Sequence, residues 1–113
     1  PSPLAPQRLA EKIATALSRE PLHISAGDKP ISRVCWCTGA AQSYIEKAAA
    51  KGMEAYISGE VSEQTVHLAR ELGIHYFAAG HHATERYGVR ALGERLSEEF
   101  GLEHRFIEVE NPV

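Results

Sequence analysis

Three short apolar segments of this sequence each end in a small residue followed by glycine, at Thr38-Gly39, Ser58-Gly59 and Ala79-Gly80. The pairs are 20 and 21 residues apart, and a segment with helical periodicity follows each of them. This spacing is typical of repeated βα units, in which a helix connects one strand to the next parallel strand. Because such connections are right-handed, all three glycine turns are expected along one edge of the sheet. The sequence therefore predicts an α/β fold with a mainly parallel sheet flanked by helices.

Hydrophobic periodicity and chain breakers divide the sequence into alternating elements. Helices are predicted for residues 7–19, 41–51, 62–72 and 84–100, and strands for residues 22–27, 32–38, 54–58, 74–79 and 104–109. The first helix carries one apolar stripe, formed by Leu9, Ile13 and Leu17. The last helix is expected to turn a second set of apolar side chains toward the core: Val89, Leu92, Leu96 and Phe100.

Composition limits the classes of function. The 113 residues suffice for one modest core, and residues 1–113 are expected to form a single α/β domain. A net charge of −3 gives no basic field for nucleic acid and no polybasic membrane patch. The sequence has neither a run of about 18 apolar residues nor a signal pattern at its start. We therefore expect a soluble, cytoplasmic protein, with Cys35 and Cys37 as buried free thiols.

The third glycine turn carries the strongest candidate for chemistry, residues 78–85, Ala-Ala-Gly-His-His-Ala-Thr-Glu. His81 and Glu85 are four residues apart, so both lie on one face and can share a metal ion if the helix has begun by His81. The helix N-terminus should then disfavour an imidazolium and keep His81 neutral. If Thr84 is the N-cap instead, His81 lies in the loop and the argument weakens. Two ligands are too few, so other parts of this chain or another chain must complete a metal site.

The other polar residues near the predicted turns have simpler interpretations beside the functional ones. The segment 38–43 either offers helix-start amides to an anion or is a packing turn. Glu60 and Glu63 fit a favourable interaction with a helix N-terminus. Four further histidines are expected to be isolated structural residues: His23, His67, His75 and His104.

The sequence also resembles a known family. The residues that carry the resemblance are 34–39 (Val-Cys-Trp-Cys-Thr-Gly), 58–65 (Ser-Gly-Glu-Val-Ser-Glu-Gln-Thr), 78–86 and the ending 111–112 (Asn-Pro). Together they are similar to the NIF-three-like family, whose bacterial members are labelled GTP cyclohydrolase type 2 homologues or dinuclear metal-centre proteins. The Gly-His-His-Ala-Thr-Glu stretch is the most diagnostic of these motifs. Family members are about twice as long, so the chain is expected to be the carboxyl-terminal half of a two-lobed protein.

The resemblance implies a particular metal site. The family holds two divalent ions between its halves, and the carboxyl-terminal half supplies the histidine and glutamate that correspond to His81 and Glu85. The absent amino-terminal half would supply a paired-histidine motif and an aspartate. This sequence departs from many members in having His82 for a tyrosine, Glu60 for an aspartate and Gln64 for a histidine, with His67 three residues later.

The function implied by the resemblance is that of a divalent-metal-dependent hydrolase, similar to a GTP cyclohydrolase and acting on a nucleotide. Histidine and carboxylate ligands suit Fe, Zn, Mn, Co or Ni. Glu60 or His82 would move protons. The alternative is a non-enzymatic, metal-binding scaffold or regulatory module, because family members form ring-shaped homo-oligomers (hexamers). In either case the 113 residues by themselves are expected to be an inactive half.

Overall fold

The computed structural model describes residues 2–113, and Pro1 lies outside the described residues. It contains one four-stranded sheet, formed by β1 (Leu22–Ile24), β2 (Val34–Cys37), β3 (Ala55–Ser58) and β4 (His75–Ala78). The strand order is β1-β4-β3-β2. Strands β2, β3 and β4 are parallel, whereas β1 runs antiparallel to β4. The predicted α/β fold with a mainly parallel sheet is therefore confirmed.

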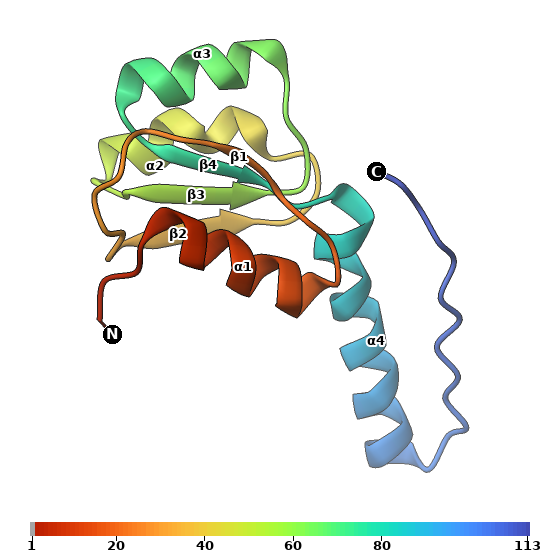
Figure 1. Ribbon diagram of the computed structural model, residues 1–113. Coiled ribbons are helices and arrows are strands. Elements are labelled where there is room, and N and C mark those ends of the chain that lie inside the picture. Colours follow the sequence, from red (N-terminus) through yellow and green to blue (C-terminus); the bar gives the residue numbers. More distant parts are fainter. Residues whose placement is uncertain (1) are drawn as a thin grey trace.

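Helices cover both faces of this sheet (Figure 1). Helix α1 (Pro6–Leu17) lies against one face, and α2 (Ile45–Ala50) and α3 (Glu63–Leu72) lie against the other. A 3-10 turn, η1 (Gln42–Tyr44), precedes α2, so the predicted helix 41–51 has an irregular first part. The fourth helix, α4 (His81–Phe100), starts at the sheet edge and extends away from it.

The alternation of strand side chains produces two hydrophobic cores, one on each face of the sheet. Tyr56 and Tyr76 pack with residues of α2 and α3, whereas Phe77 packs with Ile13 of the predicted α1 stripe. Both tyrosines are buried, and burial raises the pKa of each to about 12. Their hydroxyls are not left unpaired, because Tyr56 donates to the Ala41 carbonyl and Tyr76 to the Glu60 carbonyl. The second bond connects the core directly to the sheet edge.

Two histidines that were expected to be isolated form a pair at the other end of the sheet. The Nε2 atom of His23 lies 3.0 Å from Nδ1 of His75, which also accepts from the Ala26 N–H. The His23 ring stacks on Phe77 at 4.3 Å between centroids. Burial lowers the pKa of both histidines, and the neighbouring His75 lowers that of His23 further. The prediction that these two histidines are isolated was wrong, because pairing of β1 with β4 brings together residues 52 positions apart.

This histidine pair predicts a loss of stability in acid. Because the folded-state pKa values are lowered, the unfolded chain binds more protons, and stability falls as pH drops through about 6.5 toward the folded values. Urea unfolding at about pH 7.5 and about pH 5.5 measures the difference, which is at most about 1.4 kcal/mol per pH unit for each histidine. Replacing His23 with phenylalanine should flatten the dependence, whereas replacing the exposed His67 should not. An unchanged slope in His23→Phe would contradict this explanation.

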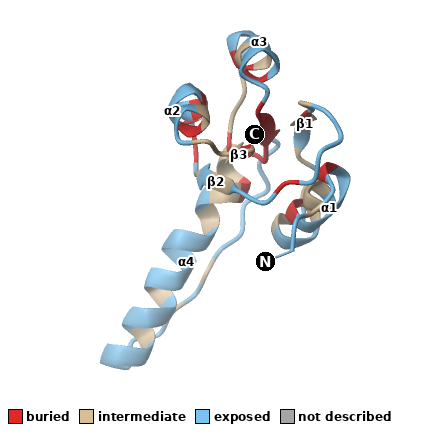
Figure 2. Ribbon diagram, turned by 90° about the vertical axis from the view of Figure 1, so that its left-hand side faces the viewer, coloured by how far each residue is buried: buried red, intermediate tan, exposed pale blue. Residues whose placement is uncertain are grey.

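Two predictions about the end of the chain were wrong. The apolar residues of α4 do not face a core, because the helix leaves the sheet and its side chains are exposed (Figure 2). Residues 104–109 do not form a strand either: they are part of an extended segment, residues 102–113, that runs back beside α4 (Figure 1). Residues 104–109 lie beside α4 and away from the sheet, so they pair with none of the four described strands.

The two cysteines lie on β2. Cys35 and Cys37 are free thiols that are half-buried against the core beneath α2 and α3, and burial raises the pKa of Cys35. Trp36 between them points outward and is exposed, as expected for alternation along a strand. None of the helices within residues 2–113 has both the length and the apolar character needed to cross a bilayer.

Candidate functional site

The three glycine turns lie side by side at one sheet edge, as their spacing predicts. The Gly59 N–H donates to the Gly39 carbonyl at 2.9 Å, and the Gly80 N–H donates to the Gly59 carbonyl at 3.0 Å. These bonds continue the parallel ladder one or two residues beyond the ends of the strands. A Cβ on Gly59 would lie 2.6 Å from the Gly39 carbonyl oxygen and 2.8 Å from the Cα of His81. Only glycine at this position lets the first turn of α4 approach so closely.

Helix α4 begins at His81, with Gly80 as its N-cap residue. The prediction that the helix starts at Thr84 was therefore wrong. Thr84 lies in the first turn, where its hydroxyl bonds to the carbonyls of Gly80 and His81 and accepts from the Gly39 N–H. The early start confirms the condition on which the pairing of His81 and Glu85 depended.

His81 and Glu85 face one another on this first turn. The Nε2 atom of His81 is 3.1 Å from Oε2 of Glu85, and both side chains are partly exposed. A Cβ built on Gly39 would lie 2.3 Å from Oε1 of Glu85 and 3.2 Å from Nε2 of His81. Because glycine has no side chain, the carboxylate of Glu85 and Nε2 of His81 converge in the space beside Gly39.

Glu60 forms a hydrogen bond with the His81 ring nitrogen that faces away from Glu85. Its Oε1 atom is 2.6 Å from Nδ1 of His81, so the carboxylate accepts a hydrogen bond from the Nδ1–H group. With the proton on Nδ1, the lone pair of a neutral ring lies on Nε2, toward Glu85. The hydrogen bond to Glu60 is the main cause that raises the pKa of His81, with the charge of Glu85 adding to it. The helix N-terminus by itself would lower the pKa of His81, but two carboxylates face the ring and the net direction is upward.

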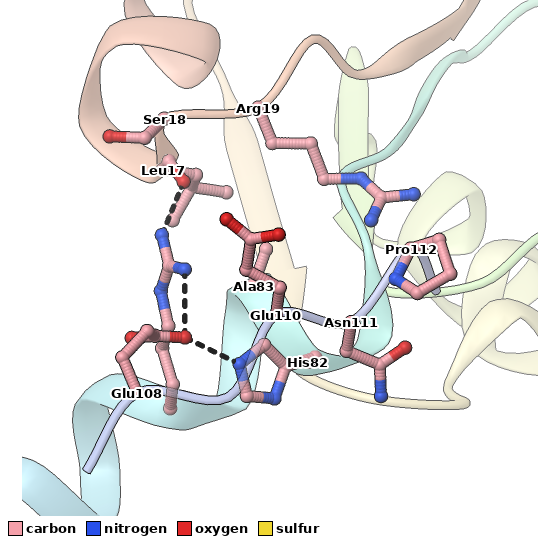
Figure 3. A pocket seen from close by; sticks show the side chains of 10 residues that line it. Leu17, Ser18, Arg19, His82, Ala83, Glu108, Glu110, Asn111 and Pro112 are labelled. Carbon is pink, nitrogen blue, oxygen red and sulfur yellow. Dashed lines mark hydrogen bonds and ion pairs between the residues drawn. The ribbon is translucent and has the colours of Figure 1, made fainter.

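His82 points to a different side of the helix start (Figure 3). Its Nε2 atom is 2.8 Å from Oε1 of Glu108, which also pairs with Arg86 at 3.4 Å. Arg86 in turn donates to the Leu17 carbonyl at the end of α1. The hydrogen bond from His82 and the charge of Arg86 lower the pKa of Glu108. This network fixes the segment 102–113 against the start of α4.

Two cavities flank the helix start. One, of about 560 Å³, lies between the end of α1, the start of α4 and the segment 102–113, and Glu108 lines it (Figure 3). The other, of about 670 Å³, is lined by His81, His82 and Glu85 together with apolar residues of α4 and of the segment 102–113. The histidine–glutamate pair therefore opens into a space of the size of small-molecule sites.

The remaining candidates lie elsewhere. His67 is exposed on α3, and His104 lies beside Gly93, where a Cβ would meet its ring. The turn 38–43 behaves as a packing turn, since the Ala41 N–H bonds to the Ser58 hydroxyl and the Gly39 carbonyl. Within residues 2–113, no group of three or more histidine, cysteine, aspartate or glutamate side chains is arranged to hold a metal ion.

Three residues of this site escaped the sequence reasoning. Gly39 was predicted only as a turn residue, although the lack of a side chain there leaves room for His81 and Glu85 to face one another. Arg86 closes the motif 78–86 but was given no role, and Glu108 belongs to no motif. Their contact with His82 depends on the return of the chain along α4. No signal in the sequence identifies Glu108, because the contact partners are 26 positions apart.

Comparison with curated proteins gives long matches of high identity. The chain is 58% identical over 111 residues to a Pseudomonas aeruginosa protein and 56% identical over 111 residues to one from Allochromatium vinosum, both named "GTP cyclohydrolase 1 type 2 homolog". In each case the match covers 98% of this chain and 44% of the relative. The chain therefore spans about half the length of the curated relatives it matches.

Solved structures agree with this relationship. "Structural genomics, protein ybgI, unknown function" superposes with a TM-score of 0.95 at 50% identity, over 99% of this chain and 46% of that one. TTHA1606 from Thermus thermophilus gives a TM-score of 0.89 at 26% identity, over 100% of this chain and 45% of that one. The sequence profile of Duf34/NIF3 (NGG1p interacting factor 3) matches residues 1–112. On these grounds the chain belongs to the Duf34/NIF3 family.

Proposed function

We propose that this chain supplies two ligands, His81 and Glu85, to a divalent metal centre that the rest of the family protein completes. The observation that carries the proposal is the convergence of His81 Nε2 and Glu85 Oε2, 3.1 Å apart, in the space left by Gly39. The partner that completes the centre is the part of the family protein that this chain does not span, since each of these relatives is about twice as long.

The residues present fit such a centre. An imidazole nitrogen and a carboxylate oxygen suit Fe, Zn, Mn, Co or Ni. Glu60 holds Nδ1 of His81, an arrangement that orients a histidine ligand and fixes its tautomer. Because the described residues contain no group of three possible ligands, the proposed centre requires further ligands from a partner.

The activity we propose is a metal-dependent hydrolysis with a nucleotide as substrate, as the names of the curated relatives suggest. Two divalent ions, when bound, supply a water of lowered pKa and polarise a carbon or phosphorus centre. In this chain, Glu60 accepts a hydrogen bond from Nδ1 of His81. His82 lines the same cavity as His81 and is the residue we propose to carry a proton there. Glu108 and Arg86 fix His82 in that position.

Metal content tests this proposal. The chain is co-expressed with the part of the Pseudomonas aeruginosa relative that it does not match, and bound metal is measured by elemental analysis. We expect about two metal ions per complex in the parent, and loss of at least one in His81→Ala or Glu85→Ala, since each removes a ligand.

The matched controls are His67→Ala and Glu63→Ala, which remove the same residue types from the exposed surface of α3. Both should retain the metal content of the parent. Equal metal in the parent and in the His81 and Glu85 variants would exclude these residues from the centre and overturn the proposal.

A second candidate is a non-enzymatic, metal-binding scaffold that assembles into a homo-oligomer such as a hexameric ring. The exposed apolar side chains of α4 favour an assembly role. The two functions differ in turnover: nucleotide hydrolysis that disappears in Glu85→Ala supports the hydrolase. Full metal content with no turnover of any nucleotide tested supports the scaffold.

A further inference from the structure

Helix α4 and the segment that follows it form an arm that projects from the rest of the chain. The arm consists of residues 86–113, which include α4 beyond its first turn and the extended segment 102–113 (Figures 1 and 2). It adjoins the first turn of α4, and the far end of α4 lies well away from the sheet (Figure 1).

The helical part of the arm has an apolar stripe without a partner. Val89, Leu92, Leu96 and Phe100 are spaced at three, four and four residues, which places them along one side of the helix. Their exposed fractions are 64%, 58%, 41% and 67%. Helices with this spacing normally bury the stripe, and contiguous apolar surfaces of this kind mark interaction sites.

The extended part of the arm has the features of a strand without a neighbour. Ile107 and Val109 are 72% and 67% exposed, whereas Glu108 between them turns inward to His82 and Arg86. Residues 103–110 make no backbone–backbone hydrogen bond in the part of the chain that the structure describes. An extended segment with alternating side chains and free backbone groups is a template for the addition of another strand.

The size of the relatives indicates what covers this arm. Each of the curated relatives above has more than half of its length outside the match, covalently attached and therefore present at high effective concentration. The cavity of about 670 Å³ joins His81 and Glu85 to Val89, Ile107 and Val109. A chain that covers the arm therefore also reaches the donor pair, where further ligands are required.

We propose that the arm is the docking element through which this chain joins the remaining part of the family protein. The stripe on α4 packs against an apolar surface of that part, and residues 104–109 add to the edge of one of its sheets. The partner is the one that the proposed function requires, but the docking itself depends on no metal ion.

The test uses the chain co-expressed with the unmatched part of the Pseudomonas aeruginosa relative, with EDTA present throughout. Co-purification and light scattering are expected to give an equimolar complex, and amide hydrogen exchange in residues 104–109 should slow at least tenfold on binding. Leu92→Asp and Ile107→Lys should each weaken the complex at least tenfold. Leu72→Asp on α3 and Trp36→Lys on β2 are the controls, since they change exposed apolar residues outside the arm.

Two results would overturn the inference: unchanged binding in the Leu92 and Ile107 variants, or a homodimer of this chain that those variants abolish while the complex persists. If the co-expressed part does not fold separately, hydrogen exchange on the intact relative decides, because unprotected amides at the positions aligned with 104–109 contradict the proposal. A complex that forms in EDTA but binds no metal afterwards would refute the proposed function and leave the docking element established.

Discussion

Replacing Gly39 with alanine is expected to separate Glu85 from His81 and to weaken metal binding by about 10- to 100-fold, the range typical of disturbed ligand surroundings. The new Cβ would lie 2.3 Å from Oε1 of Glu85 and 3.2 Å from Nε2 of His81, so the glutamate must leave its position. Gly39 also has a φ of +67°, where a Cβ adds about 1 kcal/mol of backbone strain. Metal affinity of the reconstituted complex and chemical unfolding measure the two effects separately.

Gly73→Ala is the matched control for this substitution. Gly73 has a φ of +63°, nearly the same as that of Gly39, but a Cβ there meets no atom within 4 Å. The two variants should therefore lose similar stability from backbone strain, while only Gly39→Ala loses metal. If both variants bind metal as the parent does, the space beside Gly39 has no part in the site.

Phe77→Ala is expected to reduce the free energy of unfolding by about 3–5 kcal/mol, the largest effect on stability that we predict. Phe77 is fully buried in the core between the sheet and α1, and it also supports the stacked ring of His23. Domains of this size are stable by about 5–15 kcal/mol, so the loss is a large part of the total. Urea unfolding followed by circular dichroism measures it.

The control for Phe77→Ala is Trp36→Ala. It also truncates a large aromatic side chain on a strand, but Trp36 is 73% exposed, and the change should stay within about 0.5 kcal/mol. A loss in Phe77→Ala as small as the one expected for Trp36→Ala would mean that the core on the α1 face contributes little to stability.

The local parts of this fold follow from local signals. The strand–glycine–helix repeat predicts that β2, β3 and β4 are parallel, because each connecting helix returns the chain to the start of the next strand. The same repeat places Gly39, Gly59 and Gly80 at one edge. The spacing of His81 and Glu85 predicts their shared face, since four residues make about one helical turn.

The contacts between distant parts of the chain could not be predicted in this way. Glu60 meets His81 across 21 positions, and Glu108 meets His82 across 26, so neither contact leaves a periodic pattern. The pairing of His23 with His75 depends on β1 entering the sheet in the antiparallel direction. The raised pKa of His81 follows from the first of these contacts and reverses an expectation based on the helix alone.

At the end of the chain, the sequence predicts burial and strand pairing that the structure does not show. Alternation in residues 104–109 and the apolar stripe on α4 predict a strand and a buried helix face, but in the described residues neither segment packs against the sheet. The sequence by itself thus determined the βα repeats, the glycine edge and the donor pair, because these depend on short-range geometry. Only the tertiary structure decided which carboxylates hold the two histidines and which apolar surfaces stay open, because long-range packing controls both.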